Sequence, residues 1–118
     1  MCEDYTEPAP KKFEIMADYG GAYIWDEDCC TDLRYKYTLQ PSHDDIKNIE
    51  VEFEKWVEWF ESSFENSSNF PWEAFNSKGI SLAKKLAKLL ENNGIQITYS
   101  KPPEDKTFSN RIISISYA

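Results

Sequence analysis

The chain has 118 residues, close to the commonest size of a single domain. Apolar residues make up 41% of it and aromatic residues 15%, which is enough for a hydrophobic core and excludes overall disorder. The formal net charge of −8 disfavours binding to nucleic acid or to an anionic membrane, and no apolar run is long enough to span a bilayer. We therefore expect one globular domain over residues 12–118.

The N-terminal residues indicate a flexible tail and a cytoplasmic location. Residues 1–11 contain Pro8 and Pro10 and show no apolar periodicity, so we expect them to be flexible. They also lack the cationic and apolar regions of a signal peptide, which favours a cytoplasmic protein. In that reducing compartment Cys2, Cys29 and Cys30 are expected to be free thiols.

The negative charge is concentrated in the first half of the chain. Residues 1–66 contain 17 Asp and Glu against 6 Lys and Arg, a net −11, whereas residues 67–118 contain 4 against 7, a net +3. An acidic surface attracts basic proteins and accelerates their encounter. Acidity can equally serve solubility alone, so the charge by itself leaves both interpretations open.

Three short segments in the first third of the chain are candidate strands. Apolar and polar residues alternate over Lys12–Asp18, and Gly20-Gly21 then ends this strand. Ala22–Trp25 is a second apolar run. Asp32–Leu39 places leucines and tyrosines on one face and polar residues on the other, which suits a third strand.

The clearest helix signal follows Pro41. Ser42 is a suitable N-cap, and Asp44 and Asp45 would sit in the first turn, where the helix dipole favours them. Apolar residues then recur at helical spacing from Ile46 to Phe64. At about 100° per residue, one flank of this stripe carries five glutamates, and the opposite flank carries Glu52 with Trp59 beside it. The five are Glu50, Glu54, Glu58, Glu61 and Glu65.

The second half of the chain predicts a helix and two strands. Residues Asn66–Trp72 read as a polar loop that carries Phe70 and Trp72, and a helix follows over about residues 77–92. Asn93-Gly94 is a typical left-handed end of a helix. Ile95–Ser100 and Arg111–Tyr117 are strands. This order predicts an α+β domain: an antiparallel sheet of three to five strands with two helices packed on one face.

The segment Trp25–Cys30, WDEDCC, is the strongest candidate for a chemical site. Zinc sites use spaced pairs of Cys or His and four ligands, whereas Cys29 and Cys30 are adjacent and His43 is the single histidine. A calcium loop would need a glycine at its turn and a glutamate at its twelfth position, where Tyr37 stands. The sequence also has no C-x-x-C pair, no base beside a nucleophile and no Gly-rich phosphate loop. We therefore expect neither an enzyme nor a cofactor, and a metal-dependent enzyme that uses Asp26–Cys30 is the less favoured alternative.

Aromatic side chains next to carboxylates are instead typical of a protein-binding surface. Each such aromatic could also fill the end of a small core. The partner-binding residues that we predict are Asp26, Glu27, Asp28, Glu50, Glu54, Glu58, Trp59, Glu61 and Trp72.

Four stretches, FEIMADYGGAYIWDED, WVEWFE, PWEAFNSKGISLAKKLAKLL and NNGIQITYS, resemble small acidic bacterial immunity proteins of contact-dependent inhibition and other polymorphic toxin systems. The resemblance spans about residues 13–100 and lies in a pattern, not in a catalytic motif. It implies a protein that binds one toxin and blocks its active site or its substrate-binding surface. Many of those toxins are nucleases with basic clefts, so the expected partner is a cognate toxin, a basic nuclease. The alternative is a small adaptor or complex subunit that binds a basic housekeeping protein.

Overall fold

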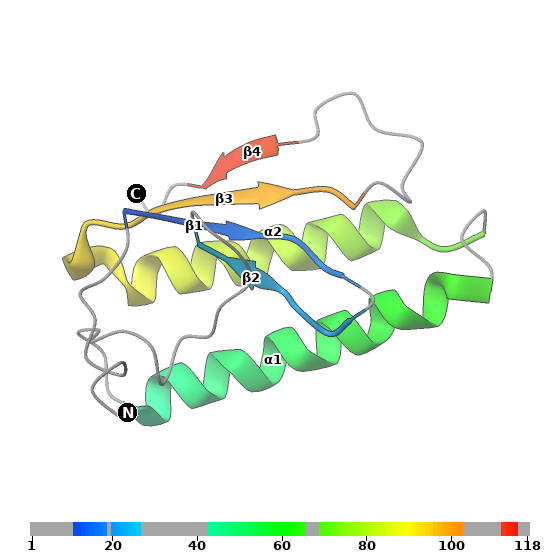
Figure 1. Ribbon diagram of the computed structural model, residues 1–118, viewed down its shortest axis with the longest axis horizontal. Helices are drawn as coiled ribbons and strands as arrows, with labels where there is room; N and C mark the ends of the chain where they lie inside the picture. The colour runs from blue at the N-terminus through cyan, green and yellow to red at the C-terminus, as the bar shows by residue number, and fades with distance from the viewer. Residues whose placement is uncertain (1–10, 19, 27–42, 66–68, 103–111, 116–118) are drawn as a thin grey trace.

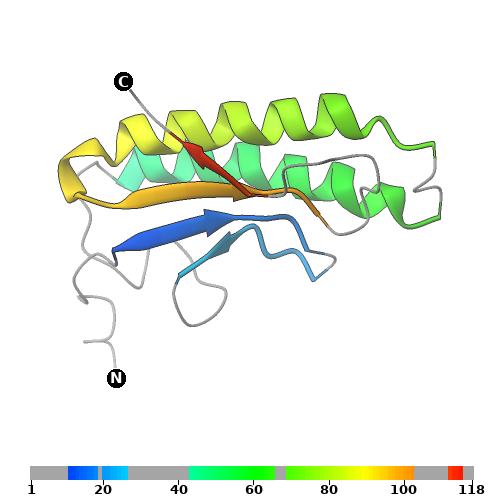
Figure 2. The same cartoon turned by 90° about the horizontal axis from the view of Figure 1, so that it is seen from above.

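The structure of the chain, a computed structural model, describes residues 11–18, 20–26, 43–65, 69–102 and 112–115. Two helices lie side by side and cover one face of a four-stranded sheet (Figures 1 and 2). This arrangement confirms the predicted α+β fold. The elements in chain order are β1 (Lys12–Ile15), β2 (Ile24–Trp25), α1 (His43–Glu61), η2 (Ser62–Glu65), α2 (Trp72–Leu89), η3 (Glu91–Asn93), β3 (Gln96–Ser100) and β4 (Ile112–Ile115).

The sheet has the strand order β2-β1-β3-β4. The outer pairs, β1 with β2 and β3 with β4, are antiparallel as predicted, but the central pair, β1 with β3, is parallel. The reason is that each element reverses the direction of the one before it (Figure 1). An even number of reversals separates β1 from β3, so the two strands point the same way, and the sheet is mixed.

The turn between β1 and β2 is built by the predicted glycine pair. The Asp18 carboxylate accepts a hydrogen bond from the backbone N–H of Gly20 at 2.9 Å, and the backbone N–H of Gly21 donates to the Asp18 carbonyl at 3.0 Å. Gly21 has a φ of 92°, a conformation that suits glycine. The predicted strand Asp32–Leu39 and residues 1–10 of the predicted tail lie outside the described residues.

The first helix covers its predicted range up to Glu61, but residues 62–65, which were predicted to continue it, form the tighter η2 turn. The second helix begins earlier than predicted. α2 starts at Trp72 with Pro71 as its N-cap, five residues before Ser77. The Phe75 N–H donates to the Pro71 carbonyl at 2.9 Å and so closes the first helical turn. Proline tolerates this position because its missing N–H would have no helical partner. α2 ends at Leu89 with Leu90 as its C-cap, three residues before the predicted end at Asn92. Gly94, predicted as the left-handed end of the helix, has a φ of 68° and caps the short η3 turn that follows.

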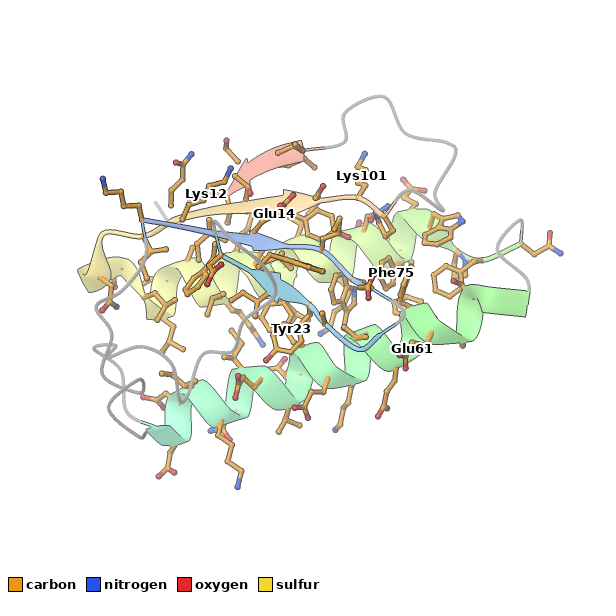
Figure 3. All side chains as sticks on the ribbon, viewed as in Figure 1. Lys12, Glu14, Tyr23, Glu61, Phe75 and Lys101 are labelled. Atoms are coloured by element: carbon orange, nitrogen blue, oxygen red, sulfur yellow. The ribbon has the colours of Figure 1, made fainter. Side chains whose placement is uncertain are left out.

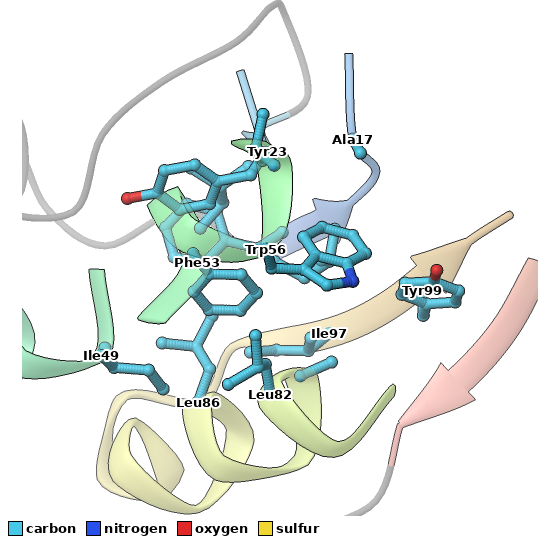
Figure 4. Packing of buried hydrophobic residues seen from close by; sticks show 14 of the residues in the cluster. Ala17, Tyr23, Ile49, Phe53, Trp56, Leu82, Leu86, Ile97 and Tyr99 are labelled. Carbon is cyan, nitrogen blue, oxygen red and sulfur yellow. The ribbon is translucent and has the colours of Figure 1, made fainter. Parts of the chain in front are cut away.

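Aromatic rings fill the space between the helices and the sheet (Figure 4). Phe75 of α2 lies at the centre, and five rings surround it within 5.8 Å, centroid to centroid. Trp56 of α1 stacks on Phe75 at 4.7 Å, and the Trp56 indole N–H donates to the Phe75 carbonyl at 3.1 Å. The other four rings belong to Trp59, Phe60, Phe70 and Trp72.

The closest approach of α1, α2 and β3 occurs at Gly79. A Cβ atom on Gly79 would lie 2.5 Å from Cζ2 of Trp56 and 2.5 Å from Cε1 of Tyr99, so no larger residue fits unless these rings move. Neither ring has room to move, because both are buried and Tyr99 also donates a 2.6 Å hydrogen bond to Asn76. Gly79 therefore sets the distance between the two helices and the sheet.

We expect Gly79→Ala to lower the free energy of unfolding by about 1–3 kcal/mol, because overpacking outweighs the better helix propensity of alanine. Urea denaturation followed by circular dichroism measures the change. Ser81→Ala, an exposed position two residues later, is the control and should change stability by less than about 0.5 kcal/mol. A Gly79→Ala variant as stable as the parent would contradict this account of the packing.

Candidate partner-binding surface

Three of the predicted contact residues form a continuous acidic strip on α1. Glu54, Glu58 and Glu61 are exposed and follow one another at helical spacings of four and three residues. Figure 3 marks Glu61 at the C-terminal end of α1. None of the three forms an ion pair with a residue that the structure describes. We call these three residues the acidic flank.

An apolar side chain adjoins the acidic flank. Val51 is 39% exposed and stands three residues before Glu54 on the same side of α1. Protein-binding surfaces combine an apolar contact with a charged rim. Val51 was not predicted as a contact, although its helical angle, next to Glu54 and Glu58, places it on this side.

Glu50, predicted as an exposed contact, is buried at 4% exposure. Its Oε2 accepts a hydrogen bond of 3.0 Å from the Tyr23 hydroxyl, and the Tyr23 ring stacks on Phe53 at 4.9 Å (Figure 3). Tyr23 immediately precedes β2, so a sheet residue covers this edge of the α1 stripe. The helical angle alone could not distinguish Glu50 from Glu54, because the covering residue comes from another element.

The two predicted tryptophans are separated from the acidic flank. Trp72 is buried at 7% exposure, and its ring packs against Phe60, Phe70 and Phe75. Trp59 is half-buried and lies on the opposite flank of α1, beside α2. In this structure Trp72 is a core residue, and Trp59 does not adjoin Glu54, Glu58 or Glu61.

Trp59 instead lines a groove between α1 and α2 with a volume of about 590 Å³. We call it the Trp59 groove; its walls are Glu52, Lys55, Trp56, Trp59, Ala74 and Lys78. Lys55 stands four residues before Trp59, so helical spacing could have indicated it. Ala74 could not be assigned, because the predicted helix began after it, at residue 77. Lys78 lies within the predicted helix, but which residues of α1 it faces depends on helix packing that the sequence does not show.

The acidic segment after β2 is only partly described. Asp26 is half-buried and directly follows β2, whereas Glu27, Asp28, Cys29 and Cys30 lie outside the described residues. The preceding Trp25 donates its indole N–H to the Met16 carbonyl at 3.0 Å, which fixes it to the neighbouring segment. Across the described part of the chain, no three His, Cys, Asp or Glu residues are arranged to hold a metal ion.

The two helices carry opposite charge. α1 contains seven Asp and Glu against two Lys, a net −5, whereas α2 contains one Glu against four Lys, a net +3. A single ion pair joins them among the described residues, between Lys85 and Glu52 at 3.1 Å. Of the two helices, α1 therefore provides the acidic surface and α2 the basic one.

The comparisons with known proteins assign no family. No family model matches the sequence, and neither a curated protein nor a solved structure matches it. In the part of the chain that the structure describes, neither helix has both the length and the apolar character needed to cross a membrane.

Truncating two neighbouring glutamates separates the buried position from the exposed one. Glu50→Ala should lower the free energy of unfolding by about 1–3 kcal/mol, because it leaves the buried Tyr23 hydroxyl without its acceptor. Glu54→Ala, one helical turn later, should stay within about 0.5 kcal/mol of the parent. Equilibrium urea denaturation measures both free energies of unfolding. A Glu50→Ala variant that stays within about 0.5 kcal/mol of the parent would contradict a structural role for Glu50.

Proposed function

We propose that this chain is a non-catalytic immunity protein of the cytoplasm, which binds a cognate toxin and neutralises it. The expected toxin is a basic nuclease, and the acidic flank on α1 makes the first contact with it. The proposal rests on the resemblance of the sequence for the identity of the partner and on α1 for the manner of binding.

The observation that carries the proposal is the lack of charge compensation on the acidic flank. Glu54, Glu58 and Glu61 have no ion-pair partner among the described residues, although α2 carries four lysines. Of these lysines, Lys85 pairs with Glu52 on the far flank of α1 and Lys88 pairs with Glu91. Within the described part of the chain, no cation neutralises the three carboxylates, which is what a contact surface for a basic partner requires.

The same arrangement is unfavourable for the isolated helix. Like charges at spacings of three and four residues destabilise a helix by roughly 0.2–0.5 kcal/mol for each pair. Glu61 adds a further penalty, because it is the last residue of α1, where the helix dipole favours cations and the last turn has no basic residue. A basic surface docked on this flank would remove both penalties, which supports binding as its role.

Different residues would accelerate the encounter with the toxin and hold the complex together. The carboxylates raise the association rate with a basic protein, and Val51 contributes apolar area at the edge of the same strip. Lysine and arginine side chains that bind nucleic acid phosphates also pair with carboxylates, so occupation of a nuclease cleft is the expected mode of inhibition.

The test is a double charge reversal on the acidic flank, Glu54→Lys with Glu58→Lys. The product of the adjacent toxin gene is co-purified with the parent chain, and association is followed by stopped-flow fluorescence at several salt concentrations. We expect the variant to associate about tenfold more slowly at low salt and to lose most of the salt dependence, because steering depends on the two carboxylates.

The matched control is Glu14→Lys with Glu73→Lys, which changes the net charge equally but lies on β1 and α2. The control should retain most of the parental association rate, and both variants should keep the parental circular dichroism spectrum. A toxin that neither binds nor loses activity with the parent chain would overturn the proposed function. Equal rates for parent and variant would remove the acidic flank from the interface.

A further inference from the structure

The Trp59 groove has features of a ligand site that the proposed toxin contact does not use. It lies on the flank of α1 opposite the acidic flank, between α1 and α2, and its volume of about 590 Å³ is in the range of small-molecule sites. Its surface is mainly apolar, and Trp56, which is buried, closes it from behind while Trp59 and Ala74 are more exposed. Such a lining suits a flat apolar group.

The aromatic wall of the groove is held rigidly from behind. The Trp59 ring contacts Phe70 at 5.5 Å and Phe75 at 5.4 Å, and Trp56 is fixed by its stack on Phe75. These contacts order the indole rings before any ligand binds, so a ligand that packs on them does not have to pay for their immobilisation.

The charges at the rim indicate the sign of the ligand. Glu52 is the only acid among the described residues that line the groove, and it is already paired with Lys85 at 3.1 Å and 3.4 Å. Lys55 and Lys78 stand on the two helices, and neither has a hydrogen-bond or ion-pair partner among the described residues. Within the described part of the chain, the groove therefore presents two cations without an ion-pair partner, in a protein whose net charge is −8.

We propose that the Trp59 groove binds a small organic anion with a flat apolar body, such as an aromatic carboxylate. The apolar body packs on Trp59 and Ala74, and the carboxylate lies between the ammonium groups of Lys55 and Lys78. A cationic ligand is disfavoured because the same two lysines would repel it. The site is separate from the acidic flank, so its occupancy does not depend on the proposed toxin contact.

The test uses 2-naphthoate as the probe and 2-naphthamide as its neutral counterpart of the same shape. Titration is followed by the NMR resonance of the Trp59 indole N–H, which is assigned from its loss in a Trp59→Phe variant. We expect 2-naphthoate to shift this resonance and to bind about three- to tenfold more tightly than 2-naphthamide, because two partly exposed charge pairs contribute modestly. Absence of a shift, or equal affinities for the two probes, would overturn the proposal.

Two variants and a control locate the binding. Lys55→Met with Lys78→Met should remove the preference for the anion and leave the affinity for 2-naphthamide unchanged. Lys47→Met with Lys84→Met removes the same charge from exposed positions of α1 and α2 outside the groove, and it should retain the preference. Ala74→Trp fills the groove from an exposed helical position and should abolish binding of both probes. A loss of preference in the control pair, or binding to the filled groove, would place the probe elsewhere and overturn the assignment.

A further experiment with a peptide distinguishes a small-molecule ligand of the groove from a segment of a partner protein. A short peptide with adjacent Asp and Phe residues carries the same chemistry on a backbone. If it binds no more tightly than 2-naphthoate, the small-ligand assignment stands. Displacement of 2-naphthoate at a concentration at least tenfold lower would show that the natural occupant is an acidic protein segment, and the small-ligand assignment would be overturned.

Discussion

The contact of Trp56 with Gly79 is the constraint on which the rest of the structure depends. The indole of Trp56 occupies the space that a side chain at position 79 would need, and it also stacks on Phe75 and lies against Tyr99 of β3. One residue thereby brings both helices and the central strand to a fixed separation. The hydrogen bond from Trp56 to the Phe75 carbonyl fixes the rotation of the indole as well. The two flanks of α1 are exposed in fixed directions as a consequence.

The orientation of α1 that this packing fixes divides the exposed surface of the helix into two regions with different chemistry. The buried stripe faces α2 and the sheet, which leaves Glu54, Glu58 and Glu61 on one side and Trp59 on the other. The side next to α2 gains lysines from that helix, whereas the opposite side does not. The acidic flank and the Trp59 groove therefore both result from the packing of Trp56 against Gly79. A single partner would have to wrap around α1 to contact both.

The sequence predicts most of the fold because its patterns are local. Helical spacing from Ile46 to Phe60 defines the buried face of α1, and Gly94 marks the end of the second helical region. What the sequence does not predict depends on partners that are distant in the chain. Tyr23, from the segment before β2, buries Glu50, and rings of α1 and α2 bury Trp72. β1 pairs with β3, where Lys12 lies opposite Gln96, and no local pattern predicts a pairing between residues so distant in the chain. The same limit applies to the Trp59 groove, because Ala74 and Lys78 of α2 meet Trp59 only through the packing of two separate helices.

The opposite net charges of α1 and α2 make the surface of the helix pair electrostatically asymmetric. α1 and α2 run antiparallel and side by side, yet their net charges differ in sign, and the ion pair between Glu52 and Lys85 compensates only one residue of each (Figure 1). The basic partner that we propose would approach the side of α1 that lies farther from the lysines of α2, because electrostatic attraction to Glu54, Glu58 and Glu61 is not opposed there by those lysines. An anion is drawn to the opposite side, where Lys55 of the otherwise acidic α1 adds to Lys78. Net charge alone predicts a single class of partner, whereas the two proposals place ligands of opposite charge on different sides of α1, where they would not compete.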